Sequence, residues 1–262
     1  MMKLSCSTCC IPDYTLDAAL KLFADAGYRY FETFATWTGG QLDVHKVDKG
    51  EVKRKLERTG IRLSSLNIEN FQAEADAEFQ EKLQRQKRNI QWAIELGCTR
   101  VNFKGGKRTP ESLRALIRGA EALAAYCEDL PVELCLGNHY GNRVEQIEDL
   151  DAVFAEVDHP KLGLLVDIGH YHSAQVNIPT VIEKYAQKIR LLHTKDQIGR
   201  RSVPFGEGEI DNVGLLRQLH DVGYSGFVVV EVEVEDKQNT PRYVRAARTY
   251  LQRILDDIND GL

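Results

Sequence analysis

Residues 162–172 read LGLLVDIGHYH, an apolar run that ends in Asp167 and is followed at once by a glycine and two histidines. A run of this length without polar alternation predicts a strand buried on both faces, as in a parallel sheet. Asp167 then lies at the carboxyl end of the strand, where parallel α/β folds build their functional sites. Asp167 and His170 are therefore candidate site residues, although an aspartate in this position often only caps the following turn.

The same alternation of apolar strand and amphipathic helix extends over the whole chain, and Gly27, Gly60 and Gly97 each end a helix just before a strand. The expected strands cover residues 3–5, 30–34, 61–66, 101–104, 132–136, a run ending at 167, 189–193 and 227–231. The expected helices cover residues 15–26, 49–59, 76–96, a segment beginning near 110, 146–156, 179–186, 213–222 and 241–258. Eight such units predict one domain over residues 1–262, a (β/α)8 TIM barrel. An open doubly wound sheet would more often show a glycine-rich phosphate turn, and the sequence has no GxGxxG motif.

The composition is that of a globular protein, with 262 residues and a net charge of -5. The acidic balance argues against a nucleic-acid partner, and without a long apolar run we expect no membrane partner and a cytoplasmic location. Six cysteines lack the density of a disulfide scaffold, so reduced thiols are expected. Cys6 and Cys9 have CxxC spacing, but the sequence has no second CxxC pair to complete a zinc site. Zinc binding or redox use of this pair is therefore disfavoured.

Polar residues follow the last four expected strands at the same end of the barrel. They are Asn138, His139, Asp167, His170, His193, Lys195, Asp196 and Glu231. Neighbouring strands lie roughly 4.8 Å apart, so a carboxylate, an imidazole and a second carboxylate from successive strands can meet on one ion with bonds of about 2.1 Å. This donor set suits manganese, magnesium, cobalt or zinc. The alternative is structural, with His193 as a satisfied core imidazole and Glu231 as a salt-bridged strand end.

These motifs resemble those of the xylose isomerase-like TIM barrels, which include sugar isomerases and epimerases, inosose isomerases and dehydratases, and endonuclease IV proteins. The resemblance rests on the segments LVDIGH (165–170), LHTKD (192–196), FGEGEID (205–211) and YSGFVVVE (224–231). It implies one divalent ion, with Mn2+ preferred, held by Asp167, His193 and Glu231. It also implies that Glu231 doubles as an acid/base and that His170 contacts substrate.

The chain departs from the family at the end of the fifth strand, where LEN or LEPH is usual and residues 136–139 read LGNH. The first metal-binding glutamate of the family is therefore replaced by Gly137. Glu133 lies roughly 13 Å back along the strand, too far to substitute, and is expected to pair lower in the barrel. His139 could replace the glutamate as a metal ligand or act as a free base, or the metal site could be degenerate.

Three functions fit this pattern. The sequence favours a metal-dependent sugar isomerase or epimerase that removes the proton beside the carbonyl of a keto sugar or cyclitol through an enediolate, with Glu231, His139 and His170 as catalytic residues. The first alternative is a lyase that eliminates a β-oxygen substituent from a keto sugar, inosose or 3-keto-glycoside. The second is a catalytically silent binding subunit. DNA endonuclease activity is disfavoured because seven histidines are too few for a three-metal cluster.

The partner predicted in each case is a small carbohydrate. Basic residues that follow the strands could hold its hydroxyls, a carboxylate or a phosphate, and the candidates are Lys104, Lys195, Arg200 and Arg201. A charged residue in a loop is also often simply solvated. A homo-oligomer is compatible with the sequence, which does not determine the oligomeric state.

Overall fold

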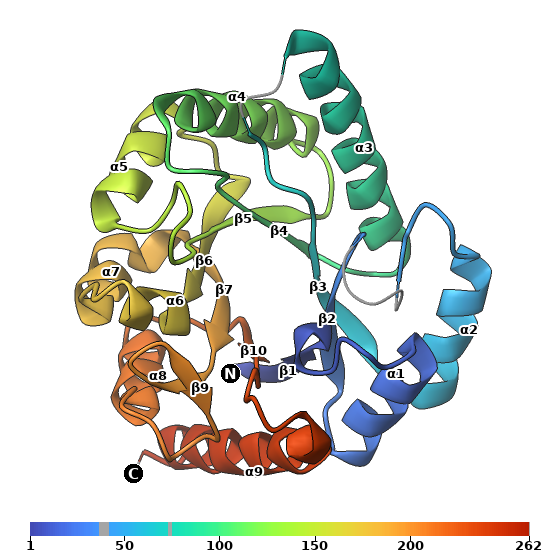
Figure 1. Ribbon diagram of the computed structural model, residues 1–262, viewed down its shortest axis with the longest axis vertical. Coiled ribbons are helices and arrows are strands. Elements are labelled where there is room, and N and C mark those ends of the chain that lie inside the picture. Colours follow the sequence, from blue (N-terminus) through green and yellow to red (C-terminus); the bar gives the residue numbers. More distant parts are fainter. Residues whose placement is uncertain (37–41, 73–74, 262) are drawn as a thin grey trace.

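The computed structural model describes residues 1–36, 42–72 and 75–261. Its strands close into a parallel barrel in the order β1-β10-β7-β6-β5-β4-β3-β2, and helices surround the barrel (Figure 1). The barrel strands are β1 (Lys3–Ser7), β2 (Tyr30–Phe34), β3 (Arg62–Asn67), β4 (Arg100–Lys104), β5 (Glu133–Gly137), β6 (Leu162–Asp167), β7 (Ile189–Thr194) and β10 (Phe227–Val230). The predicted TIM barrel is confirmed.

The helices between the strands agree with the expected segments to within one or two residues at most ends. They are α1 (Leu16–Asp25), α2 (Lys49–Thr59), α3 (Asp76–Glu95), α4 (Pro110–Tyr126), α5 (Ile147–Glu156), α7 (Ile178–Tyr185), α8 (Asn212–Asp221) and α9 (Thr240–Asn259). Short 3-10 turns are η1 (Thr8–Cys10), η2 (Ala186–Lys188) and η3 (Lys237–Asn239). The amphipathic faces of the helices pack on strands that are buried on both sides, which is why the strands read as continuous apolar runs.

Two elements of the structure were not expected from the sequence. A short helix, α6 (Ile168–Ser173), follows Asp167 directly, and a two-stranded hairpin, β8 (Asp196–Ile198) and β9 (Arg201–Val203), follows β7. His170, which follows the expected strand by three residues, therefore lies in a short helix and not in a loop. Asp167 Oδ1 accepts a hydrogen bond from the His170 backbone N–H at 3.1 Å and caps α6. Six residues are too few for a helical period to be visible in the sequence.

Glu133 and Asp196, two acidic residues that the sequence analysis considered, are paired with other parts of the chain. Glu133, expected to pair lower in the barrel, contacts Arg100 at 2.8 Å and Arg190 at 3.2 Å. All six cysteines are free and buried, in agreement with reduced thiols. The segment FGEGEID is held by Asp196, whose carboxylate accepts from the backbone N–H groups of Gly206 at 2.8 Å and Gly208 at 3.0 Å. Asp196 therefore supports a loop and does not join the other strand-end residues.

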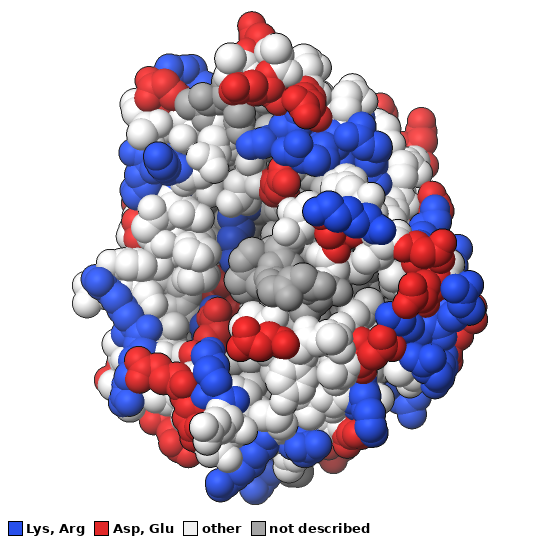
Figure 2. All heavy atoms as spheres, turned by 45° about the vertical axis from the view of Figure 1, so that its right-hand side comes forward, with Lys and Arg blue, Asp and Glu red and all other residues white. Residues whose placement is uncertain are grey.

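The surface shown in Figure 2 mixes acidic and basic side chains, with no broad stretch of one sign over the face in view. Among the described helices, none has both the length and the apolar character that a bilayer crossing needs.

Candidate active site

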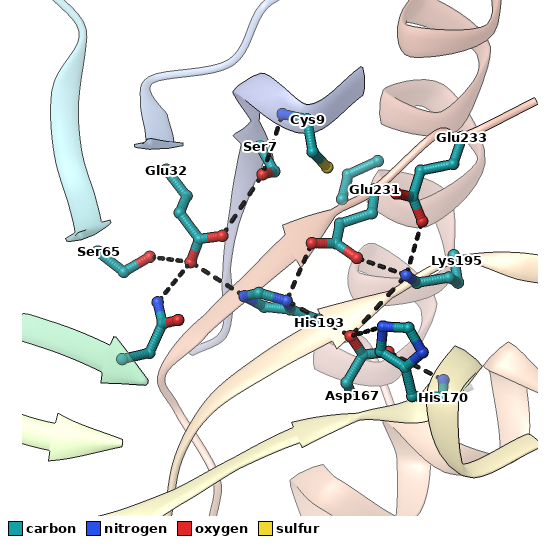
Figure 3. A network of polar contacts seen from close by, with 12 residues as sticks. Ser7, Cys9, Glu32, Ser65, Asp167, His170, His193, Lys195, Glu231 and Glu233 are labelled. Atoms are coloured by element: carbon teal, nitrogen blue, oxygen red, sulfur yellow. Dashed lines mark hydrogen bonds and ion pairs between the residues drawn. The ribbon is translucent and has the colours of Figure 1, made fainter. Parts of the chain in front are cut away.

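Four ionisable side chains from four different parts of the barrel meet inside its carboxyl end (Figure 3). Glu32 comes from β2, Asp167 from β6 and His193 from β7, and Glu231 directly follows β10. Asp167 is paired in register with His193, so their side chains lie on the same face of adjacent strands. The side chains of Glu32, Asp167 and His193 are fully buried, and that of Glu231 is 5% exposed.

The imidazole of His193 has a different carboxylate on each edge. Its Nε2 lies 2.9 Å from Glu32 Oε2, whereas its Nδ1 lies 3.1 Å from Glu231 Oε1 and 3.7 Å from Asp167 Oδ2. Burial alone would lower the pKa of His193, but Glu32 and Glu231 raise it well above its usual value. Without a bound cation the ring is therefore an imidazolium between two carboxylates.

Glu32 was missed by the sequence analysis, and it is the best-bonded carboxylate of the group. Its Oε2 accepts from Ser65 at 2.6 Å, from Asn102 at 3.0 Å and from His193. Its Oε1 accepts a longer hydrogen bond from Ser7 at 3.4 Å. The signal in the sequence was a glutamate in the middle of a strand-like run, YFETF, which needs buried partners because an unpaired charge there would be costly.

Asp167 uses its two oxygens differently. Oδ1 caps α6, and the main chain of Asp167 is fixed by Asn138, which donates to its carbonyl at 3.0 Å and accepts from its N–H at 2.8 Å. Oδ2 faces the site and, among the described residues, has no hydrogen-bond partner. Burial by itself would raise the pKa of this carboxyl, but the His170 ring and the Lys195 ammonium beside it hold the pKa well below its usual range. The carboxylate is ionised at neutral pH.

Lys195 is 1% exposed and its ammonium group binds carboxylates. Its Nζ lies 2.6 Å from Glu231 Oε2, 2.9 Å from Glu233 Oε2 and 3.8 Å from Asp167 Oδ2. Gly169 leaves the room for this side chain, since a Cβ there would come within 2.3 Å of its methylene groups. Because Lys195 takes Oε2 of Glu231, the other oxygen, Oε1, is left facing His193.

These residues fit a divalent cation. Glu32, His193 and Glu231 each offer a ligand atom within 4.8 Å of the others. However, Glu32 and Glu231 lie on opposite edges of the imidazole, and one ion binds only one ring nitrogen. The Nδ1 edge is the better place, because Glu231 Oε1 and Asp167 Oδ2 both face His193 Nδ1, at 3.1 and 3.7 Å, and Asp167 Oδ2 has no hydrogen-bond partner among the described residues. Glu32 would then orient the ring from behind, as outer carboxylates commonly do in metal sites.

A substitution at Glu32 tests this division of roles. We expect Glu32→Gln to weaken Mn2+ or Zn2+ binding by about 10- to 100-fold, the usual cost of losing a carboxylate behind a metal-bound histidine, while the ion is still bound at saturation. Calorimetric titration of the metal-free protein measures the change. Complete loss of binding would show instead that Glu32 is itself a ligand.

His139 and His170 form a stacked pair at the edge of the site. Their ring centroids are 3.7 Å apart, and His139 Nδ1 lies 2.7 Å from the carbonyl oxygen of Tyr140. His170 Nε2 lies 3.5 Å from Asp167 Oδ2. Burial lowers the pKa of both histidines, that of His170 to about 3, so both rings are neutral at pH 7.

The basic residues that the sequence suggested for substrate binding lie in different places in the structure. Lys104 and His139 line a cavity of about 490 Å3 at the ends of β2 to β5, together with Asn67, Glu69 and Asn70. Arg200 instead stacks over Tyr140 at 4.4 Å and lines another cavity with His172 and Glu209. Lys195, as described above, is bound to carboxylates of the chain itself.

The eight-stranded barrel and its strand-end carboxylates and histidine agree with one known family. The sequence model of the xylose isomerase-like TIM barrel matches residues 20–254. The chain belongs to the xylose isomerase-like TIM barrel family. Solved structures with the same barrel include an IOLI protein with a bound zinc atom, with a TM-score of 0.84 over 98% of this chain and 99% of that chain. A D-tagatose 3-epimerase-like protein has a TM-score of 0.82 over 99% of each chain. Both are 19% identical to this chain and show the fold alone.

Curated relatives of this xylose isomerase-like barrel include inosose dehydratases. The chain is 26% identical to that of Geobacillus kaustophilus over 281 residues, which cover 92% of this chain and 88% of the relative. It is 30% identical to that of Bacillus licheniformis over 168 residues, which cover 56% of each protein.

Proposed function

We propose that this chain is a divalent-metal-dependent carbon–oxygen lyase that removes water, or another β-oxygen substituent, from a polyhydroxylated ketone such as an inosose. One observation carries the proposal. The site has a carboxylate base, Glu231, at the end of β10, whereas β5 ends in Gly137, which has no side chain to act as a second base. A two-base epimerase needs an acid/base group on each face of the substrate, but an elimination needs one base and one acid.

The ion would be held by Asp167, His193 and Glu231 and would polarise the substrate ketone, which makes the neighbouring C–H bond more acidic. Burial alone would raise the pKa of Glu231, but Lys195 and His193 hold it well below its usual value, so the carboxylate is ionised and ready to accept a proton. Lys195 binds Oε2 and fixes the carboxylate plane. Its proposed role is thus to position the base, in place of the substrate contact expected from the sequence.

His139 and His170 are proposed to contact the substrate as neutral rings. The stacked pair presents imidazole nitrogens beside Asp167 without adding charge, which suits hydrogen bonds to hydroxyl groups. The polar lining of the neighbouring cavity, with Asn67, Asn70 and Lys104, also suits a polyhydroxylated ligand. A cavity of about 490 Å3 is large enough for a single sugar or cyclitol ring.

The comparisons support dehydration or isomerisation of a sugar-like ketone. The two inosose dehydratases described above are more similar in sequence to this chain than the two solved structures are. Isomerisation, which the sequence pattern favoured, requires His139 to act as the second base in place of the missing glutamate. The contact between His139 Nδ1 and the Tyr140 carbonyl leaves only Nε2 for that task.

The test is to incubate the Mn2+-loaded protein with an inosose in deuterium oxide and follow the reaction by proton NMR. We expect the α-proton to exchange and the ketone to lose water, giving an enol that becomes a 1,2-diketone. Exchange with recovery of an epimer or an aldose–ketose pair would favour the isomerase instead. Neither exchange nor product over a panel of inososes, keto sugars and 3-keto-glycosides would favour a binding subunit.

A further inference from the structure

Lys104 ends strand β4, which lies opposite β10 in the barrel order, so Lys104 and Glu231 face each other across the mouth. The Lys104 side chain is only 14% exposed. Its Nζ lies 3.9 Å from Asp167 Oδ2, which is beyond hydrogen-bond distance, and it makes no hydrogen bond within the described part of the chain. Among the described residues, the ammonium group is therefore held near Asp167 by charge alone, and its N–H groups are available to a ligand.

Gly137 is what gives Lys104 this position. A Cβ at residue 137 would lie 2.9 Å from Leu165 Cδ2 and 3.2 Å from Lys104 Cγ, so the lysine stem packs where a side chain at 137 would begin. The backbone N–H of Lys104 is held by Asn70 Oδ1 at 2.7 Å. A side chain at residue 137 would therefore displace the Lys104 stem or the Leu165 side chain.

Lys104 lies beside the cavity that is proposed above to hold the substrate. Lys104 lines the cavity together with His139, while its Nζ faces Asp167 of the proposed metal site. Lys104 therefore connects the cavity with the reacting end of the barrel, on the side away from Glu231.

We propose that Lys104 is the acid of the elimination and delivers a proton to the departing β-oxygen. This inference rests on the lyase function proposed above. Glu231 takes the α-proton, and the electron pair of the C–H bond passes into the ketone to give an enolate. In a second step the ketone re-forms, the electron pair forms the C=C bond, and the C–O bond breaks with its electron pair on oxygen. Lys104 protonates that oxygen, which leaves as water or an alcohol, and Glu231 and Lys104 then return to their starting states by exchanging protons with solvent.

The test separates proton removal from departure of the oxygen. We expect Lys104→Met to keep α-proton exchange in deuterium oxide within about threefold of the unmodified protein and to slow loss of water by about 10^2-fold or more, as expected for a missing general acid. A substrate with fluorine in place of the β-hydroxyl needs no proton to leave, and its elimination should be restored in the same variant. Lys107→Met, at an exposed residue of the same loop, is the control and should change neither rate.

Metal binding provides a readout that does not depend on turnover. Removing a positive charge 3.9 Å from a ligand oxygen should tighten Mn2+ binding by about tenfold in Lys104→Met. If exchange falls as far as elimination, or if the fluorinated substrate is not rescued, Lys104 is not the acid. If the unmodified protein shows no exchange and no elimination with any ketone, the lyase function itself is wrong, and the metal titration still reports whether Lys104 faces the ion.

Discussion

Glu231→Gln should leave the barrel folded and lower both α-proton exchange and elimination by about 10^3-fold, because the amide can neither accept the substrate proton nor replace the carboxylate at an ion. The side chain is 5% exposed, and its two oxygens face His193 and Lys195. Loss of the carboxylate leaves both cations with one partner fewer, so a modest fall in melting temperature is also expected. Proton NMR in deuterium oxide and thermal unfolding measure the two effects.

Glu233→Gln is the matched control for this substitution. Glu233 binds the same ammonium group at 2.9 Å, but its side chain is 43% exposed and it lies two residues after Glu231 in the chain. We expect Glu233→Gln to retain most of the activity. Equal losses in the two variants would mean that the charge balance around Lys195, and not a base at Glu231, controls the reaction.

Asp167→Asn should weaken divalent-metal binding by more than about 100-fold, which exceeds the usual cost of losing an outer carboxylate such as Glu32. The amide keeps an oxygen to cap α6 but presents an NH2 group where Oδ2 stands, and an NH2 group does not bind a cation. Metal content after dialysis and calorimetric titration measure the change. We expect the secondary structure to be unchanged, since the substitution keeps the size of the side chain and its cap.

Asp211→Asn controls for the capping function alone. Asp211 caps α8 through a hydrogen bond from the Gly214 N–H at 2.8 Å, in the same way that Asp167 caps α6. Metal affinity should be unaffected in this variant. If Asp167→Asn also keeps its metal, then the ion is held by Glu32, His193 and Glu231, and the assignment of the Nδ1 edge is incorrect.

The sequence by itself determined the barrel and one wall of the site. Continuous apolar strands, helices that stop at glycines and eight repeats indicate a closed parallel sheet, because strands buried on both faces belong to parallel α/β folds and eight such units close into a barrel. Polar residues directly after such strands must gather at one end, so Asp167, His193 and Glu231 could be named from their positions alone. Local sequence carries this information because strand ends and side-chain alternation are local properties.

Only the tertiary structure shows which of those residues contact one another, and their proposed roles follow from these contacts. Glu32 lies 161 positions from His193 in the chain, and nothing local shows that it holds the Nε2 edge of that ring. Lys195 looked like a substrate contact, but its stem runs past Gly169 to two carboxylates. Gly137 was recognised in the sequence as a missing glutamate, but only the structure shows that the Lys104 stem packs where a side chain at 137 would begin. Such pairings depend on which strands become neighbours and on how much space their side chains leave, and both are fixed only when the barrel closes.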